Sequence, residues 1–218
     1  PSANSERLAA FSKSEERRVL EAADRIGHGW GLACRIARYT GLRYGDVAML
    51  RWDNVDLEKR VVNVVPSKTA RHGVTVRMPI CSVLHDTLVK AFACRGGSEH
   101  VLPEHADWYN NRSKSPAGPF SSVLLKAGVS GNFTFHSWRH TFRTRLAEAG
   151  VSDEIAKRLG GWTVDRTAMR YDHDGRITEL TAAVEAGAML ESRTVAGSGG
   201  PGKMTAARRI ILARERVI

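Results

Sequence analysis

Two nearby segments of the sequence hold residue types that together could grip and attack a phosphate diester. The segment HSWRH places His136 and Arg139 three residues apart, and GGWTVDRTAMRYDH follows with Trp162 and Tyr171. On a helix, residues at i and i+3 share a face, so His136 and Arg139 are expected side by side. A guanidinium group donates two parallel hydrogen bonds to a phosphate, and an activated phenol can act as a nucleophile. Each residue alone is better explained as an ordinary surface or core residue.

Three further residues lie upstream. Arg43 and Asp46 belong to TGLRYGDVAML, where Gly41 is the predicted end of a helix, and Lys68 lies in a basic turn between two β-branched runs. Phosphoryl transfer without a metal needs cations for the charge on the non-bridging oxygens, a nucleophile, and a group that protonates the leaving oxygen. The set contains candidates for all three.

The composition favours a nucleic-acid partner. Thirty-three Lys and Arg against 23 Asp and Glu give a net charge of +10, which attracts polyanions. No apolar run reaches the roughly 20 residues that cross a bilayer. The three cysteines form no C-x-x-C pair, so we expect buried or partly buried free thiols in a reducing cytoplasm. The spacing of His and Cys shows no metal-ligand pattern, and we expect neither a metal nor a cofactor.

The local patterns predict a mainly helical domain with a small antiparallel sheet. Ser12 and Glu15 form a capping box for the first helix, which Gly27 ends. Further helices are expected over 28–40, within LRYGDVAMLRW, and over 82–95, 135–149 and 152–160, with one more after Thr163. Strands are expected in VVNVV and VTVRMPI, and the segment 96–119 is expected to be loop-rich.

The order of these motifs resembles the tyrosine recombinases, also called phage-type integrases. The resemblance runs from about Ser12 to Leu180 and includes TGLRYGDVAMLRW, the lysine between strands, HSWRHTFRTRLAEAGV, LGGW and RYDH. It implies the α+β catalytic-domain fold of that family. It also implies a metal-independent reaction, in which a tyrosine attacks DNA and leaves a 3′-phosphotyrosine and a free 5′ hydroxyl.

The resemblance assigns a role to each candidate. Arg43 and Arg139 clamp the scissile phosphate, and Lys68 is the general acid at the 5′ oxygen. His136 assists proton transfer, and Tyr171 is the nucleophile. Trp162 stands where His is more frequent, which leaves it hydrogen bonding and packing; Asp46, where Glu is more frequent, and His140 are supporting residues.

The same resemblance implies a domain layout and partners. We expect a linker remnant over 1–11, a catalytic domain over 12–185, a flexible linker over 186–202 and a tail helix over 203–218 that docks through Ile210, Ala213 and Val217. Family members usually carry an N-terminal DNA-clamping domain, so the Pro1 start favours a catalytic fragment. The expected partner is a double-stranded attachment site, bound as a homotetramer by a protein that can be monomeric in solution. We expect a cytoplasmic protein, encoded by a bacterium or a phage, that acts on the chromosome.

Two other functions use a similar fold. A type IB topoisomerase performs related chemistry on one duplex, although LGGW and RYDH favour the recombinases. A non-catalytic DNA-binding regulator would be expected to lack the tyrosine or an arginine, and none is missing. A metal-dependent nuclease has no carboxylate cluster to support it.

Overall fold

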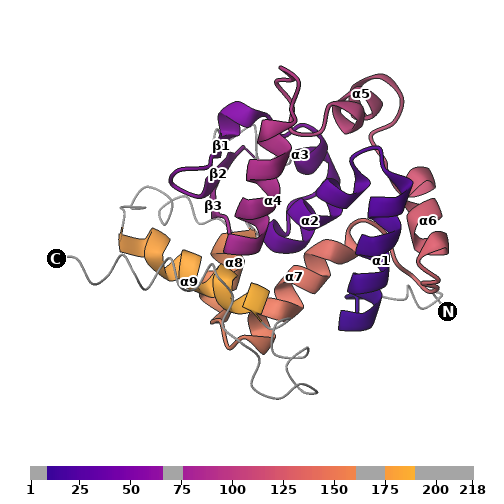
Figure 1. Cartoon of the computed structure of the whole chain (residues 1–218). Coiled ribbons are helices and arrows are strands. Elements are labelled where there is room, and N and C mark those ends of the chain that lie inside the picture. The colour runs from indigo at the N-terminus through magenta and orange to yellow at the C-terminus, as the bar shows by residue number, and fades with distance from the viewer. Residues whose placement is uncertain (1–8, 66–75, 161–174, 190–218) are drawn as a thin grey trace, which may run out of the picture.

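The computed structural model describes residues 9–65, 76–160 and 175–189 (Figure 1). Its elements in chain order are α1 (Lys13–Ile26), α2 (Trp30–Thr40), α3 (Tyr44–Ala48), the 3-10 helix η1 (Trp52–Asn54), β1 (Val55–Asp56), β2 (Val61–Val64), β3 (Val76–Pro79), α4 (Ser82–Ala93), α5 (Pro103–Asn111), α6 (Ala117–Lys126), α7 (Ser137–Glu148), α8 (Asp153–Gly160) and α9 (Gly175–Met189). The strands form one antiparallel sheet in the order β1-β2-β3. The predicted fold class is confirmed.

The first two helices show how local chemistry sets their ends. The Ser12 hydroxyl accepts the Glu15 N–H at 3.3 Å, while the Glu15 carboxylate accepts the Ser12 N–H at 2.8 Å, so the predicted capping box is present. Helix α2 begins at Trp30 rather than at residue 28. His28 and Gly29 have φ values of 51° and 74°, and this left-handed backbone cannot continue a helix.

The sheet confirms the two predicted strands and adds a third. Val62 on β2 lies opposite Met78 on β3 in antiparallel register. Strand β1 pairs Val55 with Val62 on the other side. A strand of two residues is too short to show an alternating pattern in the sequence, so β1 was not predicted. The turn that carries Lys68 lies outside the described residues.

The segment 96–119, predicted to be loop-rich, also contains helix α5 and the start of α6. Pro103 occupies the first turn of α5, where its missing N–H costs nothing, and Asn111 donates to the Asp107 carboxylate at 2.7 Å. Helix α6 then begins at Ala117. The Gly, Pro, Asn and Ser content suggested loops, but burial of α5 side chains such as His105 stabilises the helix.

The C-terminal side of the domain also differs from expectation. Helix α9 had not been predicted, and it continues to Met189, beyond the boundary at residue 185 where a linker was expected. It packs against α7 and β3. The rest of the predicted linker, the tail helix, and the helix expected after Thr163 lie outside the described residues.

The core joins α2 to α1 on one side and α7 on the other (Figure 1). Trp138, Phe120 and Ile36 are among its largest fully buried side chains. Cys34 and Cys81 are buried free thiols, whereas Cys94 is an exposed one, contrary to expectation. Within the described ranges, none of the helices combines the length and apolarity that a membrane crossing requires.

Acid should destabilise this fold through His105. The side chain is only 3% exposed, and burial lowers its pKa from 6.5 to about 4. Between these two pKa values the imidazole is protonated in the unfolded chain but neutral in the folded chain, which favours unfolding. The contribution of neutral His105 to the free energy of unfolding is therefore present above pH 6.5 and is lost as the pH falls toward 4. We expect urea unfolding to show a loss of about 2 kcal/mol between pH 7 and pH 5. His105→Gln should flatten that dependence.

Candidate functional site

The junction between α2 and α3 positions the first arginine. Gly41 ends α2 with φ 65° in the left-handed region, and its N–H still donates to the Ala37 carbonyl at 2.8 Å. The chain then turns, so that half-buried Arg43 is the N-cap residue of α3. Asp46 lies in the first turn of the same helix and is buried. Asp46 and Arg43 are thus held within one short, rigid segment.

Helix α7 positions the second arginine and two histidines. Trp138, Phe142 and Leu146 bury one side of the helix in the core. Arg139 is itself 6% exposed, whereas His136 at the N-cap and His140 one turn later are exposed. The two imidazole rings lie edge to face with centroids 5.3 Å apart.

One hydrogen bond joins the two segments. Nη1 of Arg139 donates to the carbonyl oxygen of Gly41 at 2.7 Å, across 98 residues of sequence. Gly41 is required there for two reasons: its φ is positive, and an added Cβ would lie 2.5 Å from Cδ1 of Phe142. The last turn of α2 therefore fixes the guanidinium of Arg139 next to the start of α3.

The electrostatics of this pair favour an anion. The pKa of Arg139 is lowered to about 10, mainly by burial and then by the positive charge of Arg43. The negative charge of Asp46 opposes both effects. Arg139 stays cationic at neutral pH, but its charge carries a penalty from desolvation and from a like charge. A phosphate oxyanion would relieve both, because it supplies opposite charge and acceptor atoms.

His140 is also shifted. Burial, followed by the charges of Arg139 and Arg143, lowers its pKa below the usual value. A neutral imidazole at pH 7 can accept or donate a proton, so His140 suits a supporting role beside the arginines.

The described residues bring together only part of the predicted site. Arg43, Asp46 and Arg139 meet at the junction of α2, α3 and α7, with His136 and His140 on the same helix as Arg139. Lys68, Trp162 and Tyr171 lie outside the described residues. The described strands β2 and β3 flank the turn of Lys68, and α8 and α9 flank the segment of Trp162 and Tyr171.

Sequence reasoning did not identify two neighbours of the site. The Gly41 carbonyl is a backbone group, and only the long-range bond reveals it. Tyr109 packs over Gly45, where an added Cβ would meet its hydroxyl at 2.7 Å, and both line a cavity of about 240 Å³ beside Asp46. A cavity of about 720 Å³ near Trp30 and Trp108 includes Tyr44 in its lining but neither arginine.

Known proteins with this fold identify the class. The profile of the phage integrase family matches residues 8–176. The integrase of Salmonella phage P22 is 26% identical over 191 residues, covering 79% of this chain and 46% of that protein. The chain thus spans about half the length of the curated relatives it matches.

Solved structures of integrases share this fold. The lambda integrase catalytic core superposes with a TM-score of 0.56 at 25% identity, over 72% of this chain and 93% of that one. A lambda integrase tetramer bound to a Holliday junction gives a TM-score of 0.59 at 26% identity, over 80% of this chain and 51% of that one. The fold and the match define an integrase-type catalytic domain. The chain belongs to the phage integrase family.

Gly41→Ala should weaken both the fold and the site. The strained backbone and the contact with Phe142 together should cost about 2–4 kcal/mol of unfolding free energy. Gly150→Ala is the matched control, because Gly150 follows the end of α7 with a positive φ of 77° but an added Cβ there meets nothing within 4 Å. Urea unfolding measures both variants, and equal losses would show that the close approach to Phe142 contributes nothing.

Proposed function

We propose that this chain is the catalytic domain of a site-specific DNA recombinase that cuts and rejoins strands through Tyr171. The observation that carries the proposal is the buried Arg139, held against Gly41 beside Arg43 and Asp46. The positive charge of Arg43 acts on Arg139 across the start of α3 and outweighs the opposing effect of Asp46. Two guanidinium groups held this close suit a phosphate bound from outside.

The roles follow from phosphoryl-transfer chemistry. Arg43 and Arg139 stabilise the charge on the non-bridging oxygens as Tyr171 attacks phosphorus. His136 assists removal of the phenolic proton, since a phenol with a pKa near 10 is about one part in a thousand ionised at pH 7. Lys68 protonates the departing 5′ oxygen, and Trp162 contributes packing and an indole N–H. The phosphotyrosine conserves the bond energy, so a 5′ hydroxyl from a second strand can reverse the step.

The partner we propose is a double-stranded attachment site, on which the protein acts as a tetramer. The charge of +10 supports DNA binding, and the related lambda integrase has been solved as a tetramer on a Holliday junction. We retain the proposed division into a catalytic domain from residue 12 and a C-terminal tail from 203. Since the relatives include phage proteins, we place the activity on bacterial DNA in the cytoplasm.

Trapping on nicked DNA tests this function. A nick close to the cleavage position, on its 3′ side, lets the short fragment that carries the new 5′ hydroxyl diffuse away, so the phosphotyrosine cannot be reversed and a covalent adduct accumulates. We expect adducts with attachment-site duplexes, and exchange of strands between two duplexes. Relaxation of supercoiled DNA without exchange would instead indicate a topoisomerase, and binding without adducts would indicate a regulator.

Lys68→Ala should be rescued by sulfur at the leaving position. With an ordinary duplex, loss of the general acid should slow cleavage by about 10²–10⁴-fold. With a bridging 5′ sulfur, the thiolate departs without protonation, so the variant and the wild type should cleave at similar rates. Equal impairment on both substrates would remove Lys68 from this role.

A further inference from the structure

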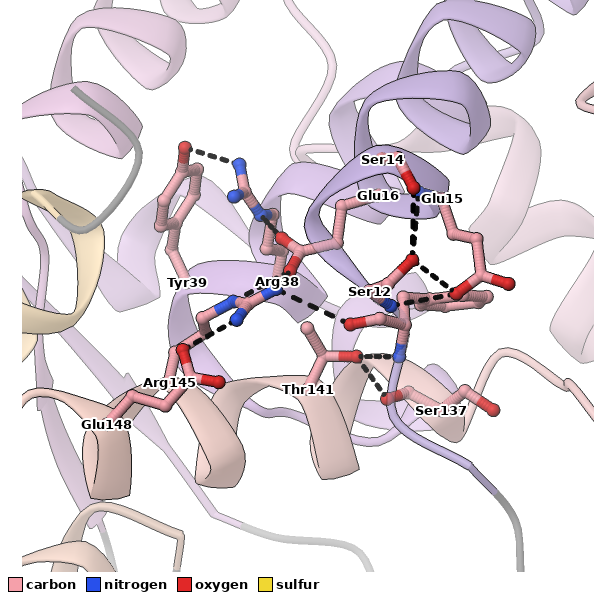
Figure 2. Close-up of polar contacts among 11 residues, drawn as sticks. Ser12, Ser14, Glu15, Glu16, Arg38, Tyr39, Ser137, Thr141, Arg145 and Glu148 are labelled. Atoms are coloured by element: carbon pink, nitrogen blue, oxygen red, sulfur yellow. Dashed lines mark hydrogen bonds and ion pairs between the residues drawn. The ribbon is translucent and has the colours of Figure 1, made fainter. Parts of the chain in front are cut away.

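A buried ion cluster joins the three helices α1, α2 and α7 (Figure 2). Glu16 on α1 is 1% exposed and receives an arginine on each carboxylate oxygen. Nε of Arg38 on α2 donates to Oε2 at 2.5 Å, and Nε of Arg145 on α7 donates to Oε1 at 2.8 Å, with Nη2 of Arg145 on the same oxygen. One carboxylate therefore ties α2 to α7.

The start of α1 strengthens the same connection. The Phe11 N–H donates to the Thr141 hydroxyl at 2.9 Å, and Nη2 of Arg145 reaches the Phe11 carbonyl at 3.5 Å. The Phe11 ring lies 4.7 Å from Trp138, centroid to centroid. Three residues of α7 thus contact one residue of the incoming chain. Thr141 lies about 200° around the helix from Arg139, on the opposite side from the site.

Stability alone does not account for such a cluster. Removing ions from water costs free energy that their attraction often fails to recover, and apolar residues of similar volume can replace a buried ion triad without loss of stability. Hydrogen bonds depend on direction more strongly than dispersion contacts do, so the cluster constrains how the three helices are placed. The cluster is therefore best explained by the geometry it imposes.

That geometry concerns the two helices that carry the arginine pair. Arg38 lies three residues before Gly41 on α2, and Arg145 lies six residues after Arg139 on α7, or about 9 Å along the helix axis. The bond from Arg139 to Gly41 is one tie between α2 and α7, and Glu16 provides a second. Added to the packing of α2 against α7, two directional ties restrict the angle between the helices more than one does.

We propose that Glu16 is a positioning residue for the phosphate-clamping arginines, acting through Arg38 and Arg145. This inference rests on the proposed function, since it concerns the geometry of that reaction. Loss of the tie should misplace Arg139 relative to Arg43 by a fraction of a helix turn. Misplacement on the order of 1 Å far from the chemistry can slow a reaction by about 10²-fold.

Three variants test it. Glu16→Gln keeps the shape but removes the anion that Arg38 and Arg145 share, while Arg145 keeps its bond to Glu148 at 2.6 Å. The triple variant Glu16→Leu/Arg38→Met/Arg145→Leu removes all three charges and preserves an apolar, filled interior. Asp24→Asn is the matched control: Asp24 binds Arg35 through two bonds of 2.6 and 2.7 Å, which also join α1 to α2 but do not reach α7.

Single-turnover cleavage at saturating DNA is compared with the Kd, below the unfolding midpoint of every variant. We expect Glu16→Gln and the triple variant to cleave about 10–10²-fold more slowly with little change in Kd, and Asp24→Asn to match the wild type. A folded triple variant that cleaves at the wild-type rate overturns the inference, as does an equal slowing in Asp24→Asn. Absence of adducts from the wild type would instead reject the proposed function.

Discussion

Tyr171→Phe abolishes covalent protein–DNA adducts and leaves DNA binding intact, if Tyr171 is the nucleophile. The substitution removes only the oxygen that attacks phosphorus, so the charge and shape of the DNA-binding surface are unchanged. We expect no adduct on nicked duplexes and a Kd within about twofold of the wild type, since binding depends mainly on contacts to phosphates.

The structure narrows the alternatives to Tyr171. Tyr39 is buried and accepts a hydrogen bond from Arg38 at 2.8 Å, and burial raises its pKa. Tyr44 is buried against His105, and burial raises the pKa of its hydroxyl to about 12. Neither can reach a DNA phosphate without leaving the core. If Tyr171→Phe still forms adducts at the wild-type rate, Tyr109 beside Gly45 is the residue to replace next.

Arg139→Ala should slow cleavage by about 10²–10³-fold, which is the usual cost of losing one donor to a developing oxyanion. Arg43→Ala should have an effect of the same order. DNA binding should weaken much less, because each arginine contributes most when charge accumulates in the transition state. Arg139→Lys keeps the charge but loses the planar fork, so we expect it to resemble Arg139→Ala more than the wild type.

Arg17→Ala provides the charge-matched control, since Arg17 is exposed on α1. It removes one positive charge from the protein without touching the site. Single-turnover rates and Kd values are measured for all four variants. A proportional fall in rate and affinity for Arg139→Ala would show that Arg139 anchors a phosphate in the ground state only.

Patterns confined to a few neighbouring residues predicted the elements well. The capping box at Ser12 and Glu15, the helix end at Gly41 and the strand VVNVV each depend on interactions within one turn or one strand. The candidate site could be proposed in the same way, because the motifs around Arg43 and Arg139 can be recognised from their residue types and from their order along the chain. Their meeting through the Gly41 carbonyl could not, since it depends on α2 and α7 packing together.

The burial of the Glu16 carboxylate was the other feature that could not be predicted from the sequence. Glu15 and Glu16 are adjacent acids in the first turn of α1, and both suit the helix dipole. Only contacts with Arg38 and Arg145, 22 and 129 residues away, distinguish the buried Glu16. One signal was present: Glu16 precedes Val19 and Ala23 at helical spacing, which places a charge on the apolar face of the helix.

Gly41 and Arg139 are 98 residues apart, so the ribosome synthesises the α2–α3 junction well before it synthesises α7. A nascent chain that ends before α7 already carries Arg43 and the α2–α3 junction, but it lacks the second guanidinium and the proposed nucleophile. Such a chain can be drawn to nucleic acid by its basic residues, but under the proposed mechanism it cannot cleave a strand. Translation of α7 is therefore the earliest point at which the arginine pair can assemble.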